Sequence, residues 1–344
     1  MTDSPIDCTA ELNARAKARK GHPATPPPAM ENEPPDFARG LLTAEKLADL
    51  EIPTRPALLG NWLKEGDLSY VFAPRGVGKS WLAALIGQAV AEGQGLGRWA
   101  AGEGPRPVFY ADCEMNLPDL KERFAKLRLD SKNFTLLSNE YLFQQEVESI
   151  NIADPGHQEA ITGLLPPGSL FILDNLSTAQ RGMKENDNDD FDLIRNWLLE
   201  LRHRKVTTIL IHHAGRNGEM RGASRREDMA HSIIGLMDAT SDGGPKRFRT
   251  HFTKNRNCRP SDEAPALVWT LADGGDGIRV DCETHSGPDV MLEHIKEGVD
   301  SARELAELLG VQAGTVSKWA KKLVEQGKIT IKSRKYQASE PPPY

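Results

Sequence analysis

A glycine-rich stretch that follows residue 68 holds the side chains best suited to chemistry. An apolar run, Leu68–Ala73, passes into Pro-Arg-Gly-Val-Gly-Lys-Ser. Gly76 and Gly78 would let backbone N–H groups approach phosphate oxygens closely. Lys79 could then reach the β- and γ-phosphates, and the Ser80 hydroxyl could bind Mg²⁺. The pattern predicts a phosphate-binding loop in a chain that hydrolyses a nucleotide.

The loop departs from the usual motif at its first glycine position, which Ala73 occupies. Alanine is small, so we interpret it as a tolerated variant. A helix predicted over residues 79–92 begins at the loop, where a helix N-terminus favours an anion. The alternative is a chance glycine turn in an α/β protein that binds no nucleotide. The predicted nucleotide-binding residues are Ala73, Pro74, Arg75, Gly76, Val77, Gly78, Lys79, Ser80 and Trp81.

Two carboxylates follow other predicted strands. The apolar run Leu170–Leu173 ends in Asp174, the arrangement by which a nucleoside triphosphatase holds the water shell of its Mg²⁺. Glu114 lies just past the predicted strand Val108–Ala111 and could orient and deprotonate an attacking water. The alternative for Glu114 is a surface or capping carboxylate, and Asp112 is its rival for the catalytic role.

The elements that must position these groups alternate between helix and strand. Such alternation predicts an α/β fold with a largely parallel sheet covered on both faces. Beyond Ser232, strands separated by Gly, Pro and Asp turns are expected to extend the same sheet in antiparallel fashion. The later parallel strands are predicted, as buried strands, at Val108–Ala111, Phe134–Leu137, Leu170–Leu173 and Thr207–Ile211. The antiparallel strands are predicted at Ile233–Met237, Phe248–Lys254, Ala266–Leu271 and Gly277–Asp281.

The length, hydrophobic content and net charge of the chain limit the kinds of protein that it could be. The chain has 344 residues, of which 39% are hydrophobic, and a formal net charge of -6. This size fits one large α/β domain with a small appendage, and the negative charge means that local basic patches would have to bind any nucleic acid. The four cysteines lack metal-ligand spacing, and no apolar stretch resembles a membrane span or a secretory signal. We therefore expect a cytoplasmic protein without a membrane partner.

The sequence divides into five predicted regions. Residues 1–40 are rich in proline and are expected to form a disordered tail. The ATPase domain is expected over residues 41–282, and a turn-rich linker over 283–288. A small helical domain is expected over residues 289–336, and a second disordered tail over 337–344.

The order of the predicted elements is that of a RecA-like ATPase core. Their detail resembles the plasmid-encoded RepA-type hexameric replicative DNA helicases and related AAA-family ATPases of mobile elements, across residues 52–282. The resemblance rests on five stretches: L-L-G-N-W-L-K-E-G-D-L-S-Y-V-F-A-P-R-G-V-G-K-S-W from Leu58, Y-A-D-C-E-M from Tyr110, L-D-N-L-S-T from Leu173, H-H-A-G-R-N-G from His212, and R-G-A-S-R-R-E-D from Arg221.

This resemblance implies ATP and Mg²⁺ as cofactors and assigns roles to individual residues. Glu114 matches the family's catalytic glutamate, and Asp174 matches its Mg²⁺-associated aspartate. His213 resembles the residue that senses the γ-phosphate, and the neighbouring His212 is the alternative.

Basic residues gather in two stretches that the resemblance also explains. Residues 246–259 carry six basic side chains and no acidic one, which suggests contact with phosphates. Within them, Lys254 and Arg256 resemble the pair that such rings insert into the next subunit's site. The loop 215–228 is expected, by analogy, to line a channel for single-stranded DNA through Arg216, Arg221, Arg225 and Arg226. The alternative for both stretches is a solvated charged face or salt bridges between subunits.

The C-terminal region resembles a winged helix-turn-helix. Its expected elements are helices Val290–Glu297, Ala302–Leu309 and Ala313–Gln326 and a hairpin Lys328–Tyr336. Lysines of the third helix would face a groove of duplex DNA: Lys318, Lys321 and Lys322. A protein-interaction winged helix and a simple packing cap are the alternatives.

The sequence as a whole favours an ATP-dependent motor, a homo-oligomer that forms a ring, expected to be a hexamer. It would move along single-stranded DNA as a replicative helicase of a plasmid, phage or mobile element. One rival is an ATPase switch that regulates through duplex DNA. A second rival is a recombination mediator that coats single strands as a filament. A small-molecule kinase would leave the basic stretch and the C-terminal domain without a role.

Overall fold

A computed structural model describes residues 36–180, 188–214, 227–259, 264–284, 287–309, 311–333 and 335–339, with only the backbone described for 188–193. By its contacts the chain divides into two compact units, residues 1–53 and 54–344. In the first unit, η1 (Phe37–Gly40) and α2 (Ala44–Asp49) bury none of their residues. The Thr43 hydroxyl accepts a hydrogen bond from the backbone N–H of Lys46 and so caps α2.

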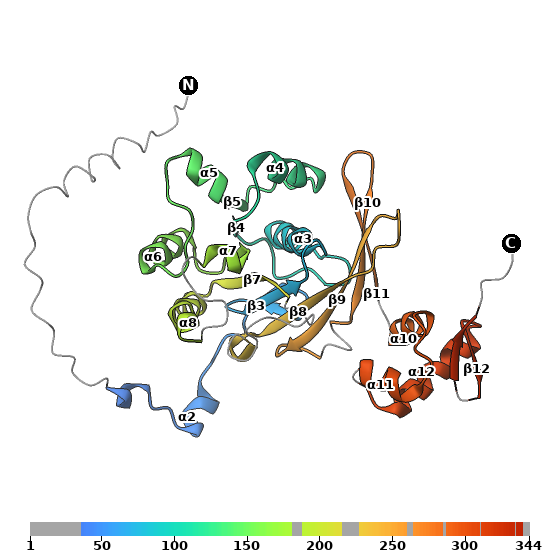
Figure 1. Ribbon diagram of the computed structural model, residues 1–344. Coiled ribbons are helices and arrows are strands. Elements are labelled where there is room, and N and C mark those ends of the chain that lie inside the picture. The colour runs from blue at the N-terminus through green and yellow to red at the C-terminus, as the bar shows by residue number, and fades with distance from the viewer. Residues whose placement is uncertain are drawn as a thin grey trace, which may run out of the picture. The chain divides into compact units, whose positions relative to one another are not determined.

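A sheet of nine strands forms the centre of the second unit (Figure 1). Its order from edge to edge is β11-β10-β9-β8-β3-β7-β6-β4-β5. The strands are β3 (Leu68–Ala73), β4 (Val108–Asp112), β5 (Phe134–Ser138), β6 (Leu170–Asp174), β7 (Thr207–His213), β8 (Ser232–Asp238), β9 (Lys246–Asn255), β10 (Leu267–Asp273) and β11 (Ile278–Thr284).

The sheet has a parallel half and an antiparallel half. β3, β4, β5, β6, β7 and β8 pair in parallel, and β8, β9, β10 and β11 pair in antiparallel. This confirms the predicted α/β class and fits the predicted RecA-like core. Because parallel strands end at one edge, the carboxyl ends of β3, β4, β6 and β7 lie together there.

Two strands differ from their predictions. β8 was predicted to be antiparallel, but it pairs in parallel with β3 and in antiparallel only with β9, because the apolar pattern of a strand does not determine which strand lies beside it. β5 differs in its burial. The segment from Phe134 was expected to be buried, but β5 is the outermost strand beside β4, and only Ser138 of it is buried. A row of apolar residues does not reveal whether a second strand pairs on the outer side. The last two antiparallel strands also run two to three residues further than predicted, to Asp273 and Thr284.

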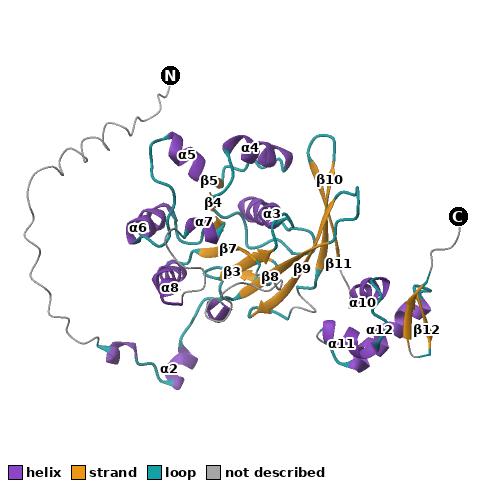
Figure 2. Cartoon of the chain, in the orientation of Figure 1, coloured by secondary structure: helices purple, strands orange, loops and turns teal. Residues whose placement is uncertain are grey.

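Helices cover both faces of the sheet (Figure 2). α3 (Lys79–Glu92) contributes most of its apolar residues to one core, while α6 (Pro155–Leu164), α7 (Leu176–Ala179) and α8 (Asn188–His203) contribute to the other. The remaining elements of this region are α4 (Leu117–Lys126), α5 (Asn139–Gln144) and the short pair β1 (Ala57–Leu59) and β2 (Leu63–Lys64). Among the residues that the structure describes, no helix is both long and apolar enough to cross a membrane.

The C-terminal elements share a core of their own. They are α10 (Gly287–Lys296), α11 (Ala302–Leu308), α12 (Ala313–Glu325), β12 (Ile329–Lys332) and β13 (Lys335–Ala338). α12 buries Val316, Ala320 and Leu323 in this core, and Ser301 caps α11 by accepting the backbone N–H of Glu304. Three helices and a hairpin therefore follow in the predicted order, and the winged-helix assignment stays a prediction.

Candidate nucleotide-binding site

The glycine-rich loop joins the end of β3 to the start of α3. Its two glycines adopt positive φ, +77° at Gly76 and +129° at Gly78, which side chains other than glycine rarely tolerate. Gly78 is constrained a second time, because a Cβ there would lie 2.9 Å from Cδ1 of Phe248 on β9. The antiparallel half of the sheet therefore supports the loop, and the fixed turn leaves the N-terminus of α3 open to an anion.

Lys79 lies within the curve of this loop, with 7% of the residue exposed. Its ammonium donates to the backbone oxygens of Ala73 at 2.9 Å and Pro74 at 2.8 Å. Burial lowers the pKa of Lys79, and the charges of Asp174 and Glu114 oppose that shift. An ammonium has three donors, so Lys79 has one further N–H for a phosphate oxygen.

A cavity of about 300 Å³ opens beside the loop. It brings together groups that are far apart in the sequence, from the phosphate loop and from the ends of β4, β6 and β7. Its lining residues are Arg75, Gly76, Gly78, Lys79, Ser80, Trp81, Glu114, Met115, Arg123, Asp174 and His213. Nine predicted site residues thus face one space: Arg75, Gly76, Gly78, Lys79, Ser80, Trp81, Glu114, Asp174 and His213.

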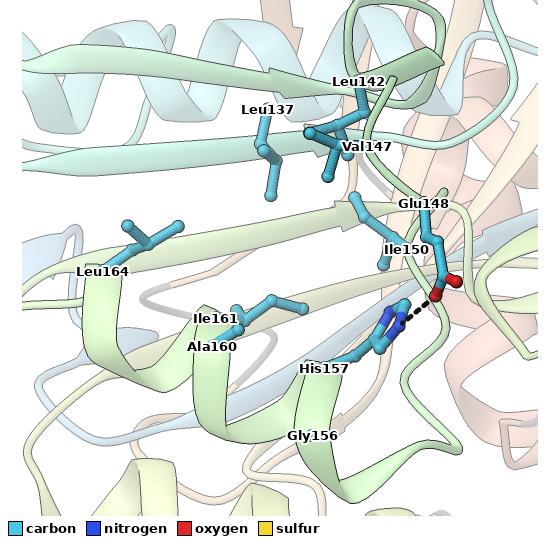
Figure 3. Close-up of a pocket in the computed structure, with 10 residues that line it drawn as sticks. All are labelled: Leu137, Leu142, Val147, Glu148, Ile150, Gly156, His157, Ala160, Ile161 and Leu164. Atoms are coloured by element: carbon cyan, nitrogen blue, oxygen red, sulfur yellow. Dashed lines mark ion pairs between the residues drawn. The ribbon is translucent and has the colours of Figure 1, made fainter. Parts of the chain in front are cut away.

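A second, larger cavity of about 410 Å³ lies between β5, α5 and α6 and has a different chemistry. Figure 3 shows mainly apolar side chains around it, among them Leu137, Val147 and Ile161. Its ionisable pair is at the rim, where Nε2 of His157 lies 3.4 Å from a carboxylate oxygen of Glu148. A lining of this kind does not suit a triphosphate, so the smaller cavity is the candidate site.

Asp174 and Ser80 are the oxygen donors suited to Mg²⁺. The Asp174 carboxylate is buried, and the Tyr110 hydroxyl donates to its Oδ2 at 2.6 Å, which fixes its direction. Burial, and then the charge of Asp174, raise the pKa of Tyr110, so that hydroxyl keeps its proton. No group of three His, Cys, Asp or Glu side chains in the described residues could hold a metal alone. Mg²⁺ commonly takes one or two protein oxygens and completes its shell with phosphates and water, and this pair fits that mode.

The structure separates the two rival carboxylates at the end of β4. Asp112 is 1% exposed and accepts the backbone N–H groups of Glu114 at 3.1 Å and Met115 at 2.8 Å. Burial raises the pKa of Asp112 to about 6. Asp112 thus holds the turn, whereas Glu114 is exposed and lines the cavity. Only Glu114 is placed to meet a bound nucleotide.

Asn175 is a site residue that sequence reasoning missed. Its Nδ2 donates to Oε2 of Glu114 and lies 3.4 Å from Nε2 of His213. His213 lines the cavity, while its neighbour His212 is fully buried within β7. Burial, and next the charge of Lys79, lower the pKa of His213. The signal for Asn175 was a polar side chain directly after the strand-ending Asp174, within one of the stretches that carry the family resemblance.

Other predicted residues lie outside this cavity. The Lys254 ammonium donates to the backbone oxygen of Glu227, and the Arg256 guanidinium donates to that of Asp228 at 2.7 Å. Neither lines the cavity of its own chain. Lys318, Lys321 and Lys322 are exposed on α12. The predicted DNA contacts Arg216, Arg221, Arg225 and Arg226 lie outside the described residues.

Arg123 of α4 is a second residue that the sequence did not single out. Its guanidinium carbon lies 5.0 Å from the ring centre of Trp81, and both side chains line the cavity. A cation over an indole face is an attractive arrangement. It gives the wall of the cavity next to the phosphate loop a positive charge.

Comparisons with known proteins place the chain in a family. A family model described as an AAA domain matches residues 31–219, more than half of the chain. No curated protein matches the chain. Among solved structures, the KaiC-like protein PH0186 from Pyrococcus horikoshii OT3 is 18% identical with a TM-score of 0.43, over 63% of this chain and 90% of that one. The flagellar accessory protein FlaH from Methanocaldococcus jannaschii is 13% identical with a TM-score of 0.41, over the same shares. On the strength of the family model, the chain belongs to the AAA domain family.

Proposed function

We propose that the chain hydrolyses ATP in the cavity beside the phosphate loop. The observation that carries this proposal is that the predicted phosphate-binding, metal-binding and water-activating groups line one cavity: Lys79, Ser80, Asp174 and Glu114. Membership of the AAA domain family supports it. The apolar lining of the larger cavity offers no comparable set of groups.

The geometry supports in-line attack of water on the γ-phosphate. Lys79 would offset phosphate charge from within the loop, and the carboxylate of Glu114 would orient the water and accept its proton. Mg²⁺ held by Ser80 and Asp174 would supply further positive charge to the phosphate oxygens. His213, which lies near the Glu114–Asn175 pair, would sense the γ-phosphate.

The test of this proposal is the rate of ATP hydrolysis by Glu114→Gln. The amide cannot accept the proton, so kcat should fall by about 100-fold or more, while binding of a fluorescent ATP analogue persists. Glu148→Gln is the matched control, because Glu148 is an exposed carboxylate at the rim of the other cavity. An unchanged kcat in Glu114→Gln would exclude this role of Glu114.

We further propose that the ATPase forms a ring, expected to be a hexamer, that moves along single-stranded DNA as a replicative helicase of a plasmid, phage or mobile element. Lys254 and Arg256 support this, because they lie outside the cavity of their own chain, as groups that complete a neighbour's site must. In a ring, their charges would offset the charge that develops on the neighbour's ATP. A filament-forming recombination mediator would use the same shared site, and electron microscopy separates closed rings from open filaments.

A second candidate is an ATPase switch that regulates through duplex DNA. The observation that favours it is the division of α12 into a buried face (Val316, Ala320 and Leu323) and exposed lysines (Lys318, Lys321 and Lys322). A triple variant with all three lysines changed to alanine distinguishes the switch from the motor, by its ATP hydrolysis and its DNA binding. Under the motor proposal, the triple variant keeps the stimulation of ATP hydrolysis by single-stranded DNA. Under the switch proposal, the wild-type protein binds duplex DNA but not single-stranded DNA, and the triple variant no longer binds duplex DNA.

A further inference from the structure

The Asn175 side chain is fixed at both ends of its amide. Its Oδ1 accepts the backbone N–H of Thr178 at 3.0 Å and the Thr178 hydroxyl at 3.2 Å, which caps α7. The residue is only 1% exposed. If the Asn175 amide were turned over, Oδ1 would no longer cap α7 and would instead face the Glu114 carboxylate. The hydrogen-bond partners therefore assign the orientation of the amide. The cap therefore directs the two N–H groups of Nδ2 towards the nucleotide cavity.

The two N–H groups have one acceptor each within reach. One is the Oε2 of Glu114, and the other is the Nε2 of His213 at 3.4 Å. For Nε2 to accept, the imidazole must be neutral with its proton on Nδ1. The charged groups around His213 are Lys79 and Arg75, which disfavour the imidazolium, and Glu114 and Asp174, which favour it. Burial is the largest of the effects on this group, and it lowers the pKa of His213.

From these contacts we propose that Asn175 is a positioning residue, which holds the Glu114 carboxylate in place for the attacking water and links it to His213. The proposal rests on the proposed role of Glu114 in hydrolysis. Glu114 is exposed, so its side chain would sample several rotamers if nothing held it. A buried, capped amide removes that freedom, and catalysis is sensitive to displacements of about 1 Å.

The link to His213 follows from the same amide. His213 is the last residue of β7. If the end of β7 moved, His213 would move relative to Nδ2 of Asn175, and the Glu114 carboxylate that shares Nδ2 would shift as well. A γ-phosphate sensed at His213 would in this way affect the group that activates water. Asn175 would then transmit the state of the nucleotide over a path of two hydrogen bonds.

The test compares three variants in steady-state ATP hydrolysis. Asn175→Ser and Asn175→Asp both keep an oxygen that can cap α7 but lack the amide donors, and the second adds a negative charge beside Glu114. For both, kcat should fall by about 10- to 100-fold with KM for ATP changed by less than about twofold. Thr178→Val is the control, because it removes one partner of Oδ1 and leaves the backbone N–H bond and Nδ2 in place. Its kcat should stay within about threefold of the wild type.

A double variant shows whether Asn175 acts through Glu114. If it does, Asn175→Ser added to Glu114→Gln should cause no further loss of kcat. An unchanged kcat in Asn175→Ser, an equal loss in Thr178→Val, or additive losses in the double variant would each overturn the proposal. Full activity of Glu114→Gln alone would instead overturn the proposed role of Glu114. Thermal melting of each variant separates these results from a loss of folding.

Discussion

The ring of Phe248 packs against Gly78, so that a Cβ added to the glycine would lie 2.9 Å from Cδ1 of the ring. Phe248 is fully buried and stacks on Trp269 of the neighbouring strand at 6.5 Å between ring centres. The ring cannot give way easily, because it is buried in a close-packed core. The antiparallel half of the sheet therefore supports the phosphate loop, through the packing of Phe248 of β9 against Gly78.

This contact predicts that Gly78→Ala destabilises the protein more than Gly76→Ala does. Both glycines have positive φ, but the position of a Cβ at Gly76 has no atom within 4 Å. The cost at Gly76 should be about 1 kcal/mol of backbone strain, and at Gly78 overpacking should add about 1–3 kcal/mol. Urea unfolding measures both. Gly163→Ala, in α6 with open space around it, is the control and should be neutral or stabilising. Equal costs at the two loop glycines would argue against the Phe248 support.

Tyr110→Phe should raise the Mg²⁺ concentration that gives half-maximal ATP hydrolysis. The Tyr110 hydroxyl donates to Oδ2 of Asp174 at 2.6 Å, and without it the carboxylate loses the group that directs it. Loss of such an outer contact commonly weakens a metal site by about tenfold or more. A titration of the rate with Mg²⁺ at saturating ATP measures the change. Tyr141→Phe, on the exposed surface of α5, should behave as the wild type. A Tyr110→Phe protein with an unchanged Mg²⁺ requirement would contradict the role of the Tyr110 hydroxyl in directing Asp174 towards the metal.

His251 should make the protein less stable in acid. It lies on β9 opposite Gly235 of β8, and its ring occupies the space that a Cβ at Gly235 would need. Burial lowers its pKa from 6.5, and the charge of Arg249 lowers it further. Below pH 6.5 the unfolded chain therefore binds a proton that the folded chain resists, and stability falls as the pH drops through the folded pKa.

The variant His251→Gln isolates this effect from that of other histidines. The wild type should lose stability relative to His251→Gln between about pH 8 and about pH 5. Urea unfolding of both proteins across this range gives the difference. A difference that does not change with pH would mean that His251 titrates alike in the folded and unfolded chains.

Local sequence chemistry predicted the parts of the site that are contiguous in the chain. The strand, the glycine loop and the start of α3 were recognisable because turn geometry and phosphate binding require particular residues at fixed spacing. Glu114 and Asp174 could be proposed because each is a carboxylate at or just past the end of a predicted strand.

The connections between these segments were not readable from the sequence. Burial decided between Glu114 and Asp112, and burial depends on how β4 sits among its neighbours. Asn175 bridges β4 and β7 through one amide, and Phe248 reaches the loop from a strand 170 residues further along the chain (residues 78 and 248). Such contacts depend on strand order, which periodicity alone does not determine.

If a neighbouring subunit completes each ATPase site, two different inactive variants should restore activity when they are mixed. ATP hydrolysis is measured with single-stranded DNA for Lys79→Ala, for Arg256→Ala and for an equal mixture of the two. Each variant alone should be inactive, because every site lacks either the loop lysine or the neighbour's arginine. The mixture should regain part of the wild-type rate, because some interfaces then pair an intact loop with an intact arginine. Full activity of Arg256→Ala alone, or a mixture as inactive as its parts, would contradict the shared site.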